Sequence, residues 1–116
     1  MRTIKFRAWD SRKEKMFFWE NTYQASEFWD DVQYPDTLPV MQYTGINDKN
    51  GVEIYEGDIV GYDYNSTPIV HYIDEVSFNQ EWCCWGFGIF SLEPTIRKTI
   101  EVIGNIYEND IKKIKL

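Results

Sequence analysis

The chain has 116 residues, of which 43% are hydrophobic and 27% are charged, and its net charge is −7. These proportions are typical of one globular domain, and they exclude a wholly disordered chain, a collagen-like repeat and a coiled coil. The longest run without a charged residue, at 82–92, has eleven residues, which is too short to cross a bilayer as a helix. No apolar secretory segment follows the first residues, so we expect a cytoplasmic protein without membrane contact.

The N-terminal residues predict a β-hairpin. Residues 3–9 alternate between apolar and polar side chains, which is typical of a half-buried strand with Ile4 on the core face. After a polar turn, residues 16–19 predict a second strand that pairs with the first. Trp9 falls on the face opposite Ile4, so the alternation predicts that Trp9 lies outside the core.

The segment after this hairpin is the least regular part of the sequence. Residues 21–32 are the only plausible helix, and we expect a short or distorted helix or a loop there. Residues 35–39 contain two prolines and predict an irregular connection. We therefore expect a single domain over 1–116, with an N-terminal part at about 1–39 and a C-terminal β-part at about 40–116.

From residue 40 onwards, short apolar runs alternate with turn signals. The expected strands are 40–44, 52–55, 58–64, 69–78, 82–90 and 99–103. Asn50 and Gly51 lie between the first two, and this pair is a strong hairpin signal because both residues tolerate positive φ. Many short strands and little helix predict an all-β or β-dominated fold, with an N-terminal hairpin and a small, partly open barrel.

Charge is distributed unevenly along the chain. Residues 1–15 have a net charge of +4 and residues 97–116 a net charge of +2, whereas residues 16–96 contain fourteen acidic residues and one basic residue. A broad basic face for duplex DNA is therefore disfavoured, because phosphate binding needs clustered Lys and Arg. An acidic middle is compatible with a basic protein partner, with imitation of nucleic acid, or with a solvated surface that keeps the protein soluble.

Aromatic residues are abundant, at 17% of the chain. They fit either a small β-core filled with rings or an aromatic contact surface. Trp82 and Trp85 fall on opposite faces of one expected strand, so at least one of them is expected at the surface. Exposed rings beside unpaired sheet edges also lead us to expect a weak homo-oligomer, although the net charge opposes association.

No motif in the sequence carries catalysis. Cys83 and Cys84 are adjacent and His71 is the only histidine, so the soft ligand set of a structural zinc site cannot be assembled, and we expect reduced thiols. Glu56 and Asp58 are close in sequence, but no nucleophile or histidine lies near them, so they are interpreted as turn and edge residues. We expect no enzymatic activity, no catalytic residue, no cofactor and no metal.

Aromatic and basic side chains interleave in the N-terminal hairpin. The candidate contacts to a partner or a nucleic acid are Arg7, Trp9, Arg12 and Trp19. Proteins hold single-stranded nucleic acid by stacking aromatic rings on its bases and placing cations beside its phosphates. The alternative is a hairpin whose rings are core and whose cations pair with the acidic middle. We rank a non-enzymatic protein-interaction factor first, and a single-stranded nucleic-acid or RNA-binding module that uses this hairpin second.

Three segments carry a further signal through their order and spacing. They are IKFRAWD at 4–10, with Met16 behind it, then MQYTG, DKNG and EIYEGDIV within 41–60, and VIGNIYEN at 102–109. Together these segments resemble the YopX family of small phage and prophage proteins. The resemblance implies a cytoplasmic accessory protein of a phage or prophage, without an established activity. A host or phage protein is then the expected partner.

Within the family-like segments, six residues are candidates for structural roles. They are Gly45, Gly51, Gly57, Asp58, Gly104 and Asn105. Gly57 permits a sharp turn, and Asp58 can accept hydrogen bonds from backbone amides there. This turn resembles the one that opens many SH3-like barrels, so we expect an SH3-like arrangement over about 52–107.

Overall fold

The computed structural model describes residues 3–11, 14–19, 39–64, 70–87, 90–92 and 99–109. Within these ranges every regular element is a β-strand, so the prediction of an all-β fold is confirmed. The expected helix at 21–32 lies outside the described residues. Over the same ranges, no helix has the length and apolar character that a membrane span requires.

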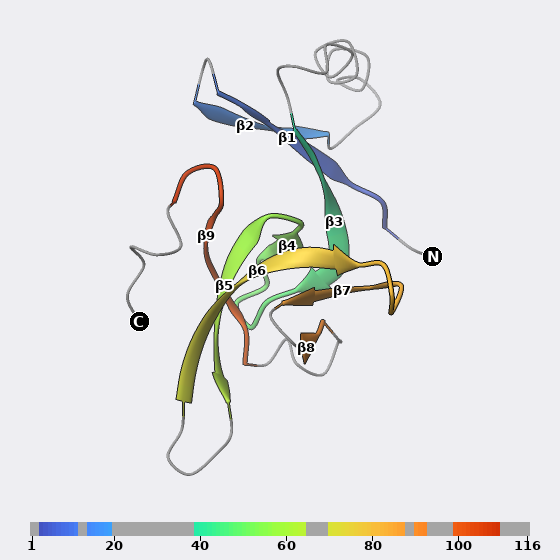
Figure 1. The fold of residues 1–116 in the computed structure, drawn as a ribbon. Coiled ribbons are helices and arrows are strands. Elements are labelled where there is room, and N and C mark those ends of the chain that lie inside the picture. Colours follow the sequence, from blue (N-terminus) through green and yellow to red (C-terminus); the bar gives the residue numbers. More distant parts are fainter. Residues whose placement is uncertain are drawn as a thin grey trace. The chain divides into compact units, whose positions relative to one another are not determined.

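Nine strands lie within the described residues, one more than the eight that the sequence predicts. They are β1 (Phe6–Asp10), β2 (Lys15–Trp19), β3 (Val40–Asn47), β4 (Glu53–Tyr55), β5 (Asp58–Tyr64), β6 (Val70–Asn79), β7 (Cys84–Phe87), β8 (Phe90–Ser91) and β9 (Glu101–Asn105). One sheet has the strand order β2-β1-β3-β4 and the other has the order β8-β7-β6-β5-β9. Figure 1 shows the strands along the chain.

The chain divides into two compact units, Met1–Tyr43 and Thr44–Leu116. In the first unit, β1 and β2 form the expected antiparallel hairpin, and the start of β3 pairs with the other edge of β1. The Tyr43 amide donates to the Lys5 carbonyl at 2.9 Å and extends this pairing by one bond. Strand β3 continues into the second unit, where β4 is its neighbour.

The predicted alternation of β1 is wrong. Ile4 is 56% exposed rather than buried, and Trp9 is 9% exposed rather than outside the core. Arg7 and Ala8 are also buried, so three consecutive side chains are covered. Arg7 and Trp9 lie on one face of the strand and Ala8 on the other, so both faces of β1 are covered, and a strand covered on both faces does not alternate.

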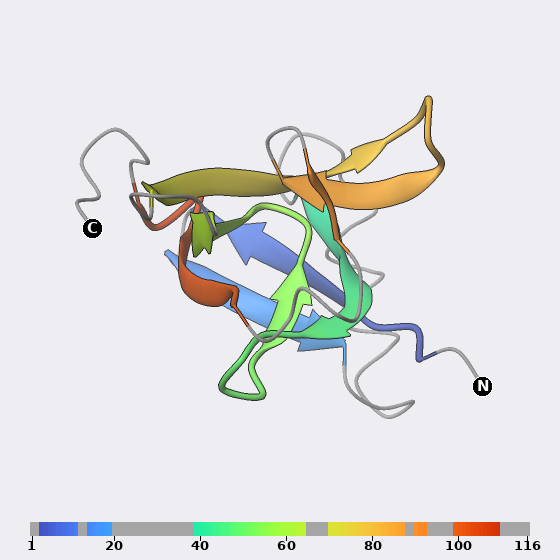
Figure 2. The same cartoon turned by 90° about the horizontal axis from the view of Figure 1, so that it is seen from below.

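The second unit is built on the five-stranded sheet. Strands β5, β6, β7 and β8 follow one another as antiparallel neighbours, and β9 returns to the outer edge of β5. The ladder between β5 and β9 shifts its register between Ile59 and Val60, and such an irregularity increases the local twist. The sheet curls into an open half-barrel, and Figures 1 and 2 show the long strand β6 bending across it.

The core of the second unit gathers apolar side chains from strands that are far apart in sequence. Its buried members are Ile54, Val60, Tyr62, Val76, Phe87, Leu92 and Ile100, with Ile46, Trp85 and Val102 packed against them. Strands β3 and β4 thus contribute to the same core as the curled sheet. Burial of such side chains is worth about 1.5–3 kcal/mol each, so this cluster is the main source of stability in the unit.

The single strand expected at 82–90 is wrong in its bounds. The structure has two short strands there, β7 and β8, and the residues before Cys84 form a turn. Cys83 has a φ of 51°, a left-handed conformation that a strand does not adopt. Trp82 therefore lies in the turn and is 72% exposed, which confirms that at least one of Trp82 and Trp85 is at the surface.

Candidate functional site

Two of the four candidate contacts of the N-terminal hairpin, Arg7 and Trp9, are buried. Arg7 is 5% exposed, and Trp9 is buried as described above, so neither side chain is offered to a nucleic acid strand. Arg12 lies outside the described residues. The backbone of Trp19 pairs with that of Phe6 in the antiparallel ladder between β1 and β2.

Two lysines of this unit lie over aromatic rings. The Lys5 Nζ is 5.8 Å from the centroid of the Tyr43 ring, and the Lys15 Nζ is 5.5 Å from that of Phe17. Both distances are within the range of a cation–π contact. These cations therefore already contact rings of their own unit, which fits the alternative in which the hairpin is a packed structural element.

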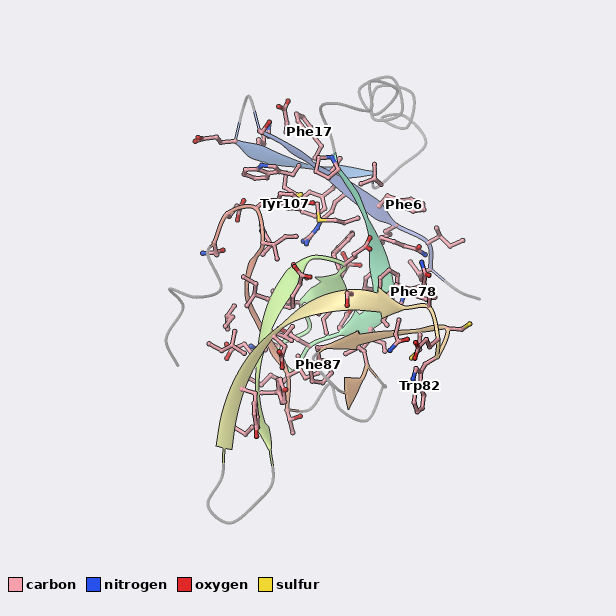
Figure 3. All side chains as sticks on the ribbon, viewed as in Figure 1. Phe6, Phe17, Phe78, Trp82, Phe87 and Tyr107 are labelled. Atoms are coloured by element: carbon pink, nitrogen blue, oxygen red, sulfur yellow. The ribbon has the colours of Figure 1, made fainter. Side chains whose placement is uncertain are left out.

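The second unit carries a cluster of aromatic rings at the end of the β6–β7 hairpin. Phe78 is 45% exposed, and it faces Trp85 across the ladder with ring centroids 5.2 Å apart and ring planes at 73°. Figure 3 shows Trp82 projecting from the turn at the same end of the hairpin. We call Phe78, Trp82 and Trp85 the aromatic tip.

Local hydrogen bonds fix the turn that carries the aromatic tip. The Asn79 side-chain oxygen Oδ1 accepts from the amides of Glu81 and Trp82, at 3.0 and 3.2 Å. This is the way in which an Asn side chain closes a turn on its own backbone. Trp85 packs against the core of the unit, so the paired rings of Phe78 and Trp85 are anchored to that core.

The stretch of sequence that contains the aromatic tip is acidic. Residues 50–96 contain eight acidic residues and neither Lys nor Arg, and β4 to β8 all lie within this range. Among these acidic residues, Glu75 of β6 and Glu81 of the turn are exposed. Aromatic rings without a basic neighbour on their own strands can attract cations but not phosphates.

A second aromatic group lies on the three neighbouring strands β5, β6 and β7, nearer the start of β6. The Tyr62 ring stacks on Tyr72 at 5.3 Å between centroids and meets Phe87 edge to face at 4.7 Å. The Tyr62 hydroxyl donates to the Asp74 carboxylate at 2.6 Å. Burial, followed by this hydrogen bond and the charge of Asp74, raises the pKa of Tyr62 well above its usual range, so the phenol stays protonated.

The described residues offer no metal centre: no group of three or more His, Cys, Asp and Glu side chains gathers among them. Cys83, in the turn before β7, and Cys84, the first residue of β7, are free cysteines, and Cys83 is exposed. The Cys83 thiol donates to the Gln80 carbonyl at 3.6 Å, within the same turn.

Comparison with known proteins identifies the family to which the chain belongs. The YopX protein family matches residues 5–111, nearly the whole chain. The chain belongs to the YopX family. A solved structure described as protein EF1440 from Enterococcus faecalis is similar to this family member over 94% of this chain and 96% of that one, with 25% sequence identity and a TM-score of 0.60. No curated protein matches the chain.

In this YopX protein, the turn between β3 and β4 depends on Asp48 and Gly51. The Asp48 Oδ1 accepts from the amides of Asn50 and Val52 at 2.8 and 2.9 Å, while Oδ2 accepts from Val102 of β9 at 2.9 Å. Asp48 is buried, and Gly51 has a φ of 82° that completes the turn. One carboxylate thus joins the turn to the edge strand β9.

The Gly57-Asp58 segment of the YopX motif lies at a second turn of the unit. The buried Asp58 carboxylate accepts from the Tyr55 amide at 2.7 Å. The Gly57 amide donates to the Val76 carbonyl, and the Gly57 carbonyl accepts from the Ile106 amide, both at 2.9 Å. The turn therefore ties β6 to the end of β9.

The Gly104-Asn105 segment closes the last described turn. The Asn105 side-chain oxygen Oδ1 accepts from the amides of Tyr107 and Glu108, at 3.0 and 2.9 Å. A Cβ at Gly104 would collide with the Asn109 side chain. Gly45, the remaining motif glycine, has a φ of 87° within β3. Among the six motif residues, Gly45, Gly51 and Gly57 thus have positive φ, while the side chains of Asp58 and Asn105 accept hydrogen bonds from backbone amides at turns.

The aromatic tip is the part of the site that sequence reasoning placed least well. The sequence pattern predicts that Trp82 and Trp85 belong to one strand at 82–90. The available signal was Asn79, because an Asn at the end of a strand can close a turn by accepting from the amides two and three residues further on. The link from Asp48 to β9 spans 54 residues and has no local signal.

Proposed function

We propose that this YopX-family protein is a non-enzymatic interaction factor, a phage or prophage accessory protein that binds another protein in the host-cell cytoplasm. The observation that carries the proposal is the pairing of exposed rings with a purely acidic stretch. Phe78 and Trp82 are exposed within residues 50–96, which contain neither Lys nor Arg. Exposed aromatic rings are enriched at protein interfaces.

The choice of partner class follows from charge. An acidic surface attracts basic proteins and repels nucleic acid, so a basic host or phage protein suits this face. The SH3-like arrangement expected for residues 52–107 is part of the same proposal, since a small barrel offers a rigid support for a binding surface. Nucleic-acid binding by the N-terminal hairpin is the less favoured alternative, because Arg7 and Trp9 are buried.

Affinity capture tests this proposal. The full chain is immobilised and exposed to lysate from a bacterial host, with and without prior nuclease treatment. We expect a protein to be retained, to resist nuclease and to be released as salt is raised. Retention of nucleic acid alone, or loss of all retained material after nuclease treatment, would contradict the proposal and favour the alternative.

A further inference from the structure

We propose that the aromatic tip binds an arginine-containing segment of the partner, with a guanidinium group over the exposed ring of Trp82. This inference rests on the proposed function and names the chemistry of its partner. The first support is exposure: Trp82 is the most exposed of the large hydrophobic side chains among the described residues. Trp is also the aromatic side chain that binds cations best.

The second support is charge complementarity. The tip lies in a range of the chain without Lys or Arg, so no side chain of residues 50–96 carries a permanent positive charge that would compete for the rings. Glu81, which is exposed, precedes Trp82 in the same turn. A carboxylate beside an indole ring suits a guanidinium, because arginine can stack on the ring and donate hydrogen bonds to the carboxylate.

The third support is rigidity. Asn79 caps the turn through two backbone amides, and Phe78 meets Trp85 edge to face. Trp85 in turn packs against the core of its unit. The turn backbone and the rings of Phe78 and Trp85 are thus held within the unit, and a support that is held before binding loses less conformational freedom when a partner binds.

These observations distinguish arginine from other occupants. Single-stranded nucleic acid would also stack on Trp82, but its phosphates would meet Glu81 and an acidic stretch without a compensating cation. A lysine would satisfy the charge, but its compact ammonium group cannot stack flat on an indole ring. Arginine combines both properties, so it is the side chain that this surface fits best.

The test measures binding of a fluorescein-labelled oligo-arginine peptide to the full chain by fluorescence anisotropy, beside an oligo-lysine peptide of equal length. We expect Trp82→Ala to weaken oligo-arginine binding about three- to tenfold, and Trp82→Phe to weaken it less. Glu81→Gln should also weaken binding, because it removes one charge. Phe18→Ala, at an exposed ring outside the tip, is the matched control and should leave binding unchanged.

Two results would overturn the inference. If Trp82→Ala binds oligo-arginine as tightly as the unaltered chain does, net charge alone causes binding. If the chain binds oligo-lysine as tightly as oligo-arginine, the ring does not select a guanidinium. In either case a protein still captured from lysate by the Trp82→Ala variant leaves the proposed function standing, so the two failures are distinguishable. Because Trp82 is so exposed, its replacement should not unfold the chain, and circular dichroism checks this.

Discussion

Asp48 shows how a single side chain can hold distant parts of a small β-protein together. Its carboxylate accepts hydrogen bonds from three backbone amides, two in its own turn and one at Val102 of β9. Asp48→Ala leaves all three without this acceptor, so we expect the free energy of unfolding to fall by at least about 2 kcal/mol. Asp48→Asn keeps one oxygen and should cost less. Urea denaturation measures both variants, and equal losses would contradict this account.

Tyr62 contributes through its hydroxyl as well as its ring. Tyr62→Phe keeps the stacking on Tyr72 but removes the hydrogen bond to Asp74, so we expect a loss of about 1–3 kcal/mol at neutral pH.

The alkaline behaviour of the two chains should also differ. The folded state raises the pKa of Tyr62 above its ordinary value of 10.0, through burial first and Asp74 second. The stabilisation is therefore present below that pH and is lost as the pH rises past it, because the phenol ionises more readily in the unfolded chain. Urea denaturation from neutral pH to beyond pH 10.0 should show a steeper decline for the unaltered chain than for Tyr62→Phe. Parallel curves would contradict this assignment.

At the scale of elements, local patterns predict most of the strands and fail where the chain departs from local rules. Strand β5 matches the range expected from its apolar run, and β3 extends beyond its expected end because Gly45 bends the strand without ending it. The sequence does not predict the break before β7, because this break depends on the left-handed backbone conformation of Cys83. Residues other than glycine rarely adopt that conformation. The burial of Trp9 was missed because alternation describes a strand with one covered face.

The turn between β3 and β4 offers a test of the backbone argument. Gly51 has a φ of 82°, and a Cβ placed there meets no atom within 4 Å. Gly51→Ala should therefore cost only the backbone penalty of a left-handed residue, about 1–2 kcal/mol. Gly51→Asn should cost less, because Asn tolerates this conformation. Thermal unfolding compares the two, and an equal cost would show that the loss comes from something other than φ.

At the scale of the whole molecule, exposed apolar side chains lead us to expect weak self-association. Strand β2 is the outermost strand of its sheet among the described residues, and Phe18 on it is exposed. Unpaired edges are covered most simply by a second copy, while the net charge of −7 keeps the association weak. Sedimentation over a series of concentrations should show a monomer–dimer equilibrium that Phe18→Lys weakens. A monomer at every concentration would contradict this expectation.

The charge layout of the whole chain and the aromatic tip together support our proposal that this YopX protein recognises a basic protein segment through its second unit. Backbone and indole NMR signals of the full chain, followed during titration with oligo-arginine peptide, test this claim most directly. The account predicts that the shifts concentrate in residues 77–85 and include the Trp82 indole signal. Shifts confined to residues 6–19, or spread evenly over the acidic residues, would contradict it.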